Sequence, residues 1–110
     1  MRSMDWDDVD DRMAAWLKQG DHAQTTVARV CLLFGALRGF PANACVAYAM
    51  WESKLSESDV TQVYAELSID EMIRLDTSNG HGPFCLYTRH EGNVALREVL
   101  YPSTESESDA

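Results

Sequence analysis

The sequence predicts an α+β fold that is mostly α, a compact bundle of about four helices followed by a small C-terminal β-hairpin. Hydrophobic residues recur at helical spacing through most of the first 67 residues, and a turn around Asn79-Gly80 then precedes a strand-like run over 84–89. At 110 residues with 45% hydrophobic residues, the chain is expected to form a single acidic globular domain over 1–102.

The first predicted helix covers residues 5–19. Its apolar residues share one arc of the helical wheel and are expected to be buried: Trp6, Val9, Met13, Trp16 and Leu17. Four acidic residues fall on the opposite side and are expected to face solvent: Asp7, Asp8, Asp10 and Asp11. Asp5 or Ser3 is expected to cap the start of this helix, and Gly20 to end it.

The second predicted helix, over 22–38, is expected to lie at the centre of the bundle. Apolar residues surround most of it, and Arg29 is the only charged residue in its middle. A capping-box pattern at 21–24 predicts its start, and Gly39 its end. Gly35 lowers helix propensity by about 1 kcal/mol relative to Ala, which predicts that a neighbouring element packs closely against it.

Two more helices are predicted before the composition changes. One begins at residue 41 or 43 and ends at residue 54, and the other covers 57–66. Ser56 begins a capping-box-like pattern at the start of the latter helix. The pattern repeats at 68–71, and the segment over 69–75 fits either a short helix or the start of a strand.

Turn residues then introduce the predicted hairpin. Residues 76–83 read as an eight-residue loop that would join strands at 72–75 and 84–89. A second turn is expected at 91–93.

The C-terminal part of the chain is less regular. The segment over 94–101 fits neither the helical nor the strand period cleanly, so a short helix and a last strand both remain open. Residues 103–110 are polar and acidic, and we expect them to form a disordered tail.

The sequence offers no recognisable catalytic or cofactor-binding motif, and we expect neither an enzyme nor a cofactor. Cys31, Cys45 and Cys85 are odd in number and widely spaced, which favours free thiols over disulfides. His81 and His90 flank Cys85, but their spacing matches no standard zinc site and a fourth ligand is missing. We therefore expect no metal.

The predicted order of helices and hairpin is that of a winged helix, in which the helix over 57–66 would be the recognition helix. Such a helix needs basic or amide side chains that reach bases and phosphates. Residues 57–67 contain three acidic residues and no Lys or Arg. The loop over 76–83 also has no Lys or Arg. With a net charge of -9 the chain would repel a duplex, so direct binding of nucleic acid is not expected.

The acidic charge is concentrated at the two ends of the chain. Residues 1–11 have a net charge of -4 and residues 105–110 of -3, while the body of the domain is nearly neutral. A solubilising surface is the simplest explanation of such charge. The alternative is that the helix over 5–19 faces a cationic partner, because carboxylates along one helical face repeat every 5–6 Å or so, a spacing close to that of nucleic-acid phosphates.

We therefore predict an acidic inhibitor or regulator that binds a basic, nucleic-acid-handling protein, in the manner of small anti-restriction, anti-CRISPR and immunity proteins. The partner-binding residues would be Asp7, Asp8, Asp10 and Asp11, with Trp51 or Tyr64 as a candidate apolar anchor if either is exposed. The alternative is a winged-helix-type regulator that acts by protein contact or weak DNA contact. No signal peptide or membrane span is predicted, so we expect a cytoplasmic protein; the sequence leaves its oligomeric state open.

Overall fold

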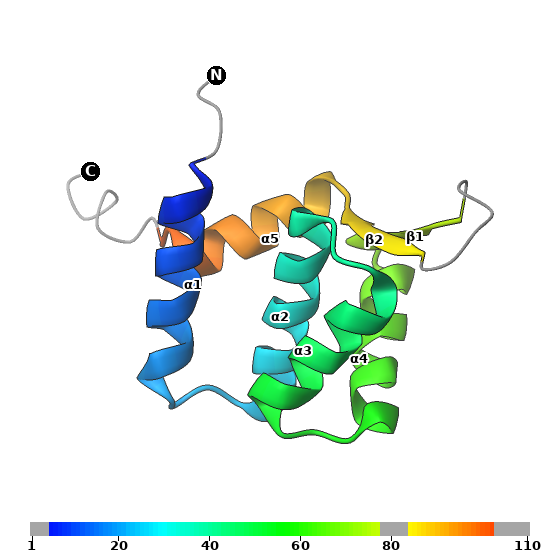
Figure 1. Cartoon of the computed structure of the whole chain (residues 1–110), viewed down its shortest axis with the longest axis horizontal. Coiled ribbons are helices and arrows are strands. Elements are labelled where there is room, and N and C mark those ends of the chain that lie inside the picture. Colours follow the sequence, from blue (N-terminus) through cyan, green and yellow to red (C-terminus); the bar gives the residue numbers. More distant parts are fainter. Residues whose placement is uncertain (1–4, 78–83, 103–110) are drawn as a thin grey trace.

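The computed structural model describes residues 5–77 and 84–102, and within these ranges it contains five helices and one antiparallel hairpin. In chain order they are α1 (Trp6–Gln19), α2 (Gln24–Arg38), α3 (Ala42–Ser53), α4 (Glu57–Ile69), β1 (Ile73–Asp76), β2 (Cys85–Thr88) and α5 (His90–Leu100) (Figure 1). The predicted fold class is confirmed. The predicted tail over 103–110 and most of the predicted hairpin loop lie outside the described residues.

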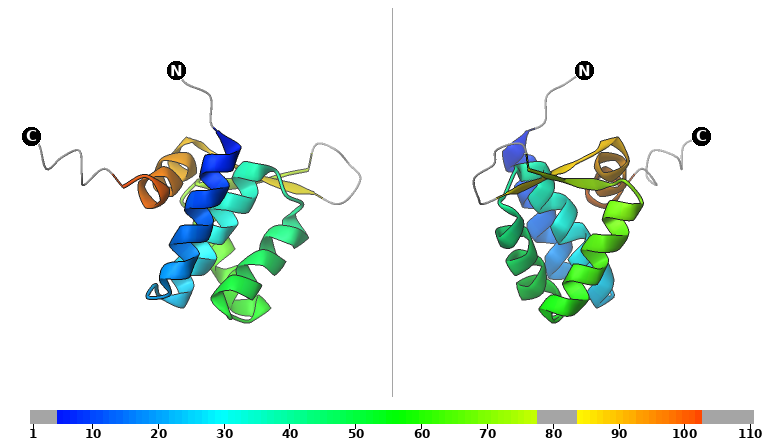
Figure 2. Two further views of the ribbon diagram at one scale, coloured as in Figure 1. Left: turned by 60° about the vertical axis from the view of Figure 1, so that its left-hand side comes forward. Right: turned by 90° about the vertical axis from the view of Figure 1, so that its right-hand side faces the viewer.

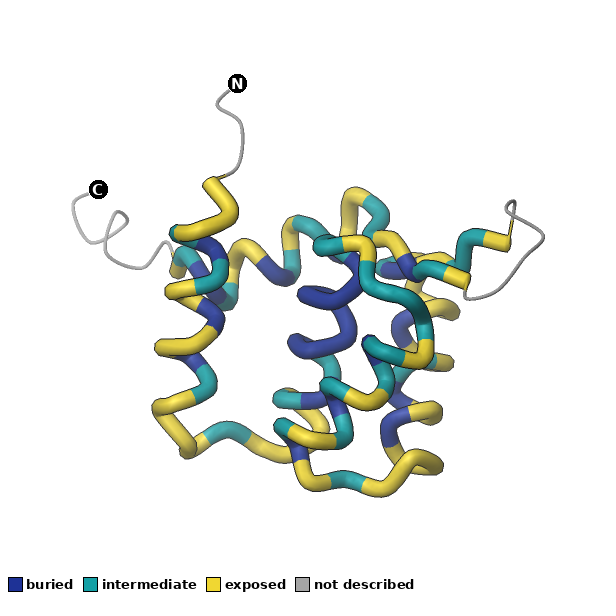
Figure 3. The backbone as a smooth tube through the Cα atoms, in the orientation of Figure 1, coloured by how far each residue is buried: buried dark blue, intermediate teal, exposed yellow. Residues whose placement is uncertain are grey.

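Helix α2 lies at the centre of the fold, as its sequence predicts. It packs against α3, α4, α5 and β2, while the hairpin and α5 lie across one end of the helices (Figure 2). The tube of α2 is buried along most of its second half (Figure 3). The side chains that α2 contributes to the core are Ala28, Val30, Cys31, Leu32, Leu33, Phe34 and Ala36.

The close packing predicted at Gly35 is confirmed. A Cβ at this position would lie only 2.7 Å from Cys45 Sγ and 3.4 Å from Phe40 Cδ2. The approach to Cys45 Sγ is shorter than van der Waals packing allows, so α3 lies closer to α2 here than a side chain at position 35 would permit without a shift.

The hairpin has an eight-residue connection, as predicted, but it covers 77–84 instead of 76–83 because β1 ends at Asp76 and β2 begins at Cys85. Residue Asp76 pairs with Cys85 and Ile73 with Thr88 in an antiparallel ladder. On its other side β2 forms an isolated bridge with Pro41, and the Ala42 amide donates to the Phe84 carbonyl oxygen at 2.6 Å. Helices α2, α3 and α4 thus precede the hairpin, and α5 follows it.

The predicted capping box at the start of α2 is wrong. The N-cap is Ala23, and no side chain caps this end of the helix. The Gln24 side chain, which would have completed the box, donates instead to the Ser53 carbonyl oxygen at 2.9 Å. Gln24 thus bonds to the last turn of α3 instead of capping the start of its own helix. At the start of α4, by contrast, Ser56 Oγ accepts from the Asp59 amide at 3.2 Å, as predicted.

The segment over 69–75, for which the sequence fits either a helix or a strand, contains the end of α4, a turn and most of β1. Helix α4 continues to Ile69, three residues beyond its predicted end, and the capping pattern at 68–71 starts no helix. Glu71 instead adopts a left-handed conformation with φ of 60°, and the Met72 amide donates to the Leu67 carbonyl oxygen at 2.9 Å. The chain then enters β1.

The predicted turn at 91–93 is also wrong, because these residues lie inside α5. Gly92 has the composition of a turn residue, but in the structure its small size permits close packing. A Cβ there would collide with the Met72 carbonyl oxygen and lie 3.1 Å from Leu33 Cδ2. The segment over 94–101, left open by its sequence, is thereby helical up to Leu100.

None of the helices in the described ranges has the length and apolar character that a bilayer crossing requires.

Candidate partner-binding surface

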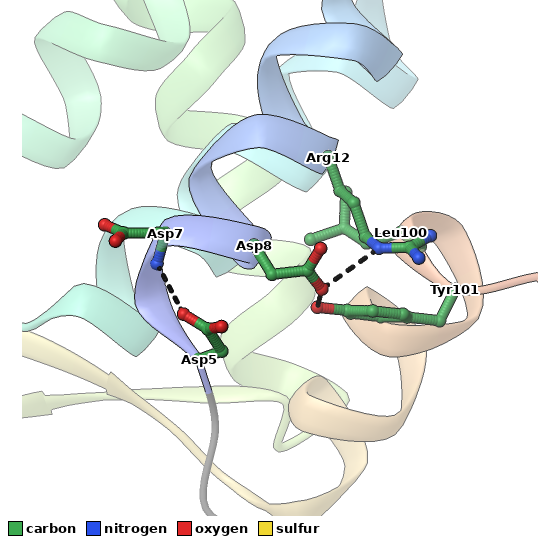
Figure 4. Close-up of polar contacts among 6 residues, drawn as sticks. All are labelled: Asp5, Asp7, Asp8, Arg12, Leu100 and Tyr101. Atoms are coloured by element: carbon green, nitrogen blue, oxygen red, sulfur yellow. Dashed lines mark hydrogen bonds and ion pairs between the residues drawn. The ribbon is translucent and has the colours of Figure 1, made fainter.

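Two of the four predicted site residues, Asp7 and Asp8, lie at the start of α1. Asp5 is the N-cap, and its Oδ1 accepts from the Asp7 amide at 3.1 Å (Figure 4). The carboxylates of Asp7 and Asp8 lie in the first helical turn, where negative charge interacts favourably with the helix dipole. These contacts explain why the helix begins here, and they leave the Asp7 side chain exposed.

Asp8 joins α1 to the end of α5. Its Oδ2 accepts from the Tyr101 hydroxyl at 2.6 Å and from Arg12 Nε at 3.2 Å (Figure 4). Arg12 also donates to the Leu100 carbonyl oxygen at 3.1 Å, and its guanidinium lies 4.2 Å from the centre of the Tyr101 ring. The hydrogen bond from Tyr101, followed by Arg12, keeps the pKa of Asp8 below its ordinary value despite an opposing effect of burial.

Asp10 contacts the other neighbour of α1. Its Oδ2 lies 3.6 Å from Arg38 Nη2 at the end of α2, and the Arg38 guanidinium lies 4.4 Å from the centre of the Trp6 ring. Trp6 was expected to be buried, but it is 39% exposed. The helical wheel wrongly predicts burial of Trp6. This residue lies in the first turn of α1, where its ring packs under the Arg38 guanidinium and not against the core.

The four predicted site residues therefore separate into two pairs. The side chains of Asp8 and Asp10 are 45% exposed and each contacts another element, so the expectation that all four face solvent holds only in part for these two. Asp7 and Asp11 are exposed, one helical turn apart, and their carboxylates contact no other side chain among residues 5–77 and 84–102. They are the members of the set that a partner can reach directly.

Most basic side chains in the described ranges contact other groups of the same chain. Ion pairs or ring contacts engage four of them: Arg12, Arg38, Lys54 and Arg89. A fifth, Arg29, donates to Met72 Sδ at 3.3 Å. The three others in the described ranges, Lys18, Arg74 and Arg97, are exposed on α1, β1 and α5 respectively. Helix α4 has none.

A polar groove of about 570 Å³ lies between α2 and α4. Thr25, Thr26 and Arg29 line it from α2, and Asp59, Gln62 and Glu66 from α4. Asp59 and Glu66 are the two carboxylates of this lining, and Arg29 is its one basic residue. The lining therefore has a net negative charge, which disfavours a phosphate in this groove.

The buried thiols are poor nucleophiles. All three cysteines are free, with Cys31 and Cys45 buried and Cys85 half-buried. Burial, the largest cause in each case, raises the pKa of Cys31 and of Cys45 to about 12. Because the thiolate is the reactive form, neither thiol is suited to covalent catalysis at neutral pH.

The described ranges contain no cluster of three or more His, Cys, Asp or Glu side chains that could hold a metal ion. His81, which belongs to the incomplete set considered above, lies outside those ranges. The expectation of no metal thus stays a prediction for the chain as a whole.

Of the two candidate anchors, Trp51 is 72% exposed and Tyr64 is half-buried. A groove of about 360 Å³ lies nearby between α3 and α4, lined by Ala42, Asn43, Val46, Ala47, Met50, Glu57 and Thr61. Sequence reasoning missed this groove. The signal was the spacing of Asn43, Ala47 and Trp51, which places small residues and a tryptophan on one face of α3.

No protein-family model matches the chain, and neither the curated proteins nor the solved structures contain a significant match. The function is therefore inferred from the charge, exposure and contacts of the described residues.

Proposed function

We propose that the protein is an acidic binding module that inhibits or regulates a basic, nucleic-acid-handling protein in the cytoplasm, and that it acts by contact and carries out no reaction. The observation that carries the proposal is the unequal use of charge. Five of the basic side chains are engaged within the molecule, whereas carboxylates such as Asp7 and Asp11 remain exposed. The chain as a whole has a net charge of -9.

Within the predicted set of four aspartates, we assign Asp7 and Asp11 to direct contact with the partner. Asp8 and Asp10 hold α1 against α5 and α2, and so fix the orientation of the face that carries Asp7 and Asp11. Exposed ion pairs contribute only about 0–1 kcal/mol each, so these charges would act chiefly on the association rate.

A winged-helix-type regulator is the second candidate, and one observation favours it. The bridge between Pro41 and β2, together with the order of α2, α3, α4 and the hairpin, is that of a winged helix. Since α4 has no basic residue, such a regulator would act by protein contact or weak DNA contact.

The test begins with the tagged full chain as bait in an extract of the native host, with the captured protein identified by mass spectrometry. Its association rate is then measured with the Asp7→Lys/Asp11→Lys variant. A matched variant, Glu91→Lys/Glu98→Lys, makes the same charge change at exposed positions of α5. Circular dichroism verifies that all three proteins are folded.

We expect a basic partner whose association is slowed at least about tenfold by the α1 variant, and less by the α5 variant. Higher salt should reduce the rate in the same direction. Equal rates for the α1 variant and the parent would remove α1 from the interface. A mobility shift of duplex DNA at about 0.15 M salt would instead favour the winged-helix regulator.

A further inference from the structure

We propose that the groove between α3 and α4, together with Trp51, docks a basic amphipathic helix of the partner. This inference rests on the proposed function, because it assigns the apolar contact that exposed charges alone do not supply. Charge mainly steers encounter, whereas buried aromatic and aliphatic contacts hold a complex together.

The groove is largely apolar on its α3 side. Ala42, Val46 and Met50 line it at four-residue spacing, and all three are half-buried. Ala47, one residue after Val46, is exposed at its edge. On the α4 side Glu57 and Thr61, both exposed, line the groove. The groove that these residues line has a volume of about 360 Å³.

Trp51 extends this surface beyond the groove. It follows Asn43 and Ala47 at four-residue spacing, so it lies on the same face of α3, one turn beyond Ala47. A tryptophan that is 72% exposed leaves a large apolar area in water, and tryptophan is among the residues most enriched in binding hot spots. The Lys54 ammonium, 5.1 Å from the ring centre, covers only part of it.

The charge around the groove determines which helix fits. Glu57 lines the groove on α4, and α4 has no Lys or Arg along its entire length. Lys54 is the only basic residue of the α3 region, and it lies over the Trp51 ring. A partner helix with Lys or Arg beside its apolar stripe would complement this border.

The shape and total charge favour this occupant over a second copy of the chain. From Ala42 to Met50 the α3 wall is about 12 Å long at 1.5 Å per residue, which matches two turns of a helix with apolar residues at i, i+3 or i+4, and i+7. A second copy would bring another net charge of -9 to the same surface, and like charges of that size oppose association.

The inference can be tested with the isotope-labelled full chain and two synthetic helical peptides of about 14 residues, roughly four turns. Both have Leu at i, i+3, i+4 and i+7, and they differ only in carrying Lys or Glu at the other positions. Amide chemical shifts and the Trp51 indole N–H signal are followed during titration. The Lys peptide should shift Ala47, Met50, Trp51 and Thr61, and the Glu peptide should shift them at least about tenfold more weakly.

Two exposed apolar residues provide matched variants. Trp51→Ala should weaken binding of the Lys peptide at least about tenfold, whereas Ile69→Ala, at a residue that is 78% exposed on α4, should leave it unchanged. Both side chains are more than two-thirds exposed, so their removal should not disturb the core.

The outcomes separate this inference from the proposed function. Shifts confined to α1 around Asp7 and Asp11 would overturn the groove and leave a basic partner on α1. Equal binding of the Lys and Glu peptides, equal effects of the two variants, or no shift with either peptide would each overturn the groove as a site for a basic helix. The proposed function is judged separately, by the association rate of the captured partner.

Discussion

The Asp8 carboxylate, which the sequence predicts to face solvent, connects α1 to the residue that follows α5. Its contacts with Tyr101 and Arg12 connect residues from opposite ends of the described chain. The Asp8 and Arg12 side chains are each 45% exposed, so their ion pair contributes little by itself. The short hydrogen bond from Tyr101 is the first cause of the lowered pKa of Asp8.

A pH dependence of stability follows from this lowered pKa. A carboxyl whose pKa is lower in the folded than in the unfolded protein stabilises the fold above its ordinary pKa, here 3.8, and this stabilisation is lost as the pH falls through the folded value. Tyr101→Phe should therefore lower the free energy of unfolding at pH 7 and make a smaller difference near pH 2. Denaturant unfolding at the two pH values measures the effect.

Tyr87→Phe is the control for this experiment, since Tyr87 is an exposed residue of β2. It should change stability little at either pH. A deficit of Tyr101→Phe that is the same at pH 7 and pH 2 would show that the tyrosine stabilises the fold without Asp8.

The cysteines should differ in reactivity according to their burial. With a disulfide reagent at about pH 8, the half-buried Cys85 should react first. Cys31 and Cys45 should react only on unfolding, because burial raises the pKa of each thiol to about 12. Absorbance of the released thiol reports the number of groups modified. Cys85→Ser should abolish the fast phase, and a native Cys85→Ser protein that still reacts rapidly would disprove the ordering.

Helix α1 packs through one narrow stripe. Val9, Met13 and Trp16 are its buried residues, and the Trp16 ring stacks on His22 with a centroid distance of 3.8 Å and an interplanar angle of 17°. Trp6, on the same arc of the helical wheel, is 39% exposed. Two tryptophans of one helix thus provide a comparison between a core position and an edge position.

We expect Trp16→Ala and Phe34→Ala each to lower the free energy of unfolding by about 3–5 kcal/mol, because both delete large buried side chains. Trp6→Ala should cost only about 1 kcal/mol, mostly through its contact with Arg38. Chemical denaturation of the three variants measures these differences. An equal loss at Trp6 and Trp16 would mean that the first turn of α1 is buried in solution.

Close contacts of α5 limit which residues its first turn accepts. Gly92→Ala should lower stability by about 1–3 kcal/mol, although alanine favours a helix by about 1 kcal/mol, because the added Cβ would meet the Met72 carbonyl oxygen and Leu33. That carbonyl already accepts from the Arg89 amide at 2.9 Å. Thermal melts give the comparison with Val94→Ala, an exposed position of α5 where little change is expected. A Gly92→Ala protein as stable as the parent would contradict the close approach.

The net charge of -9 acts on the molecule as a whole. Self-repulsion opposes the folded state, and the ion pairs that could offset it are largely exposed. Raising the ionic strength from about 0.01 M to about 0.15 M shortens the Debye length from roughly 30 Å to roughly 8 Å. We therefore expect the melting temperature to rise by a few degrees, equivalent to less than about 1 kcal/mol for a domain of this size.

Scanning calorimetry in sodium chloride and in sodium sulfate at equal ionic strength distinguishes screening from ion exclusion, since only the latter is stronger for sulfate. A melting temperature that falls with added salt would mean that the ion pairs of Arg12 and Arg38 stabilise the fold by more than the net charge opposes it.

Much of the fold follows from local sequence. The periodicity of apolar residues predicts α1 to α4, the ring of apolar residues predicts the central position of α2, and the composition over 84–89 predicts β2. Capping at Asp5 and Ser56 and the close approach at Gly35 are also confirmed. These features depend on residues a few positions apart, or on the size of a single side chain, and both can be read directly.

Tertiary contacts decided the remainder. The Gln24 side chain bonds to Ser53 instead of capping α2, and Gly92 lies in a helix where it packs against Met72 and Leu33. The Asp8 carboxylate accepts a hydrogen bond from Tyr101. For the candidate site, the sequence correctly predicts that Asp7 and Asp11 are exposed, but it reveals neither the contacts of Asp8 and Asp10 with α5 and α2 nor the groove between α3 and α4. The physical reason is that periodicity identifies which side chains share a face, whereas exposure depends on which neighbour covers that face.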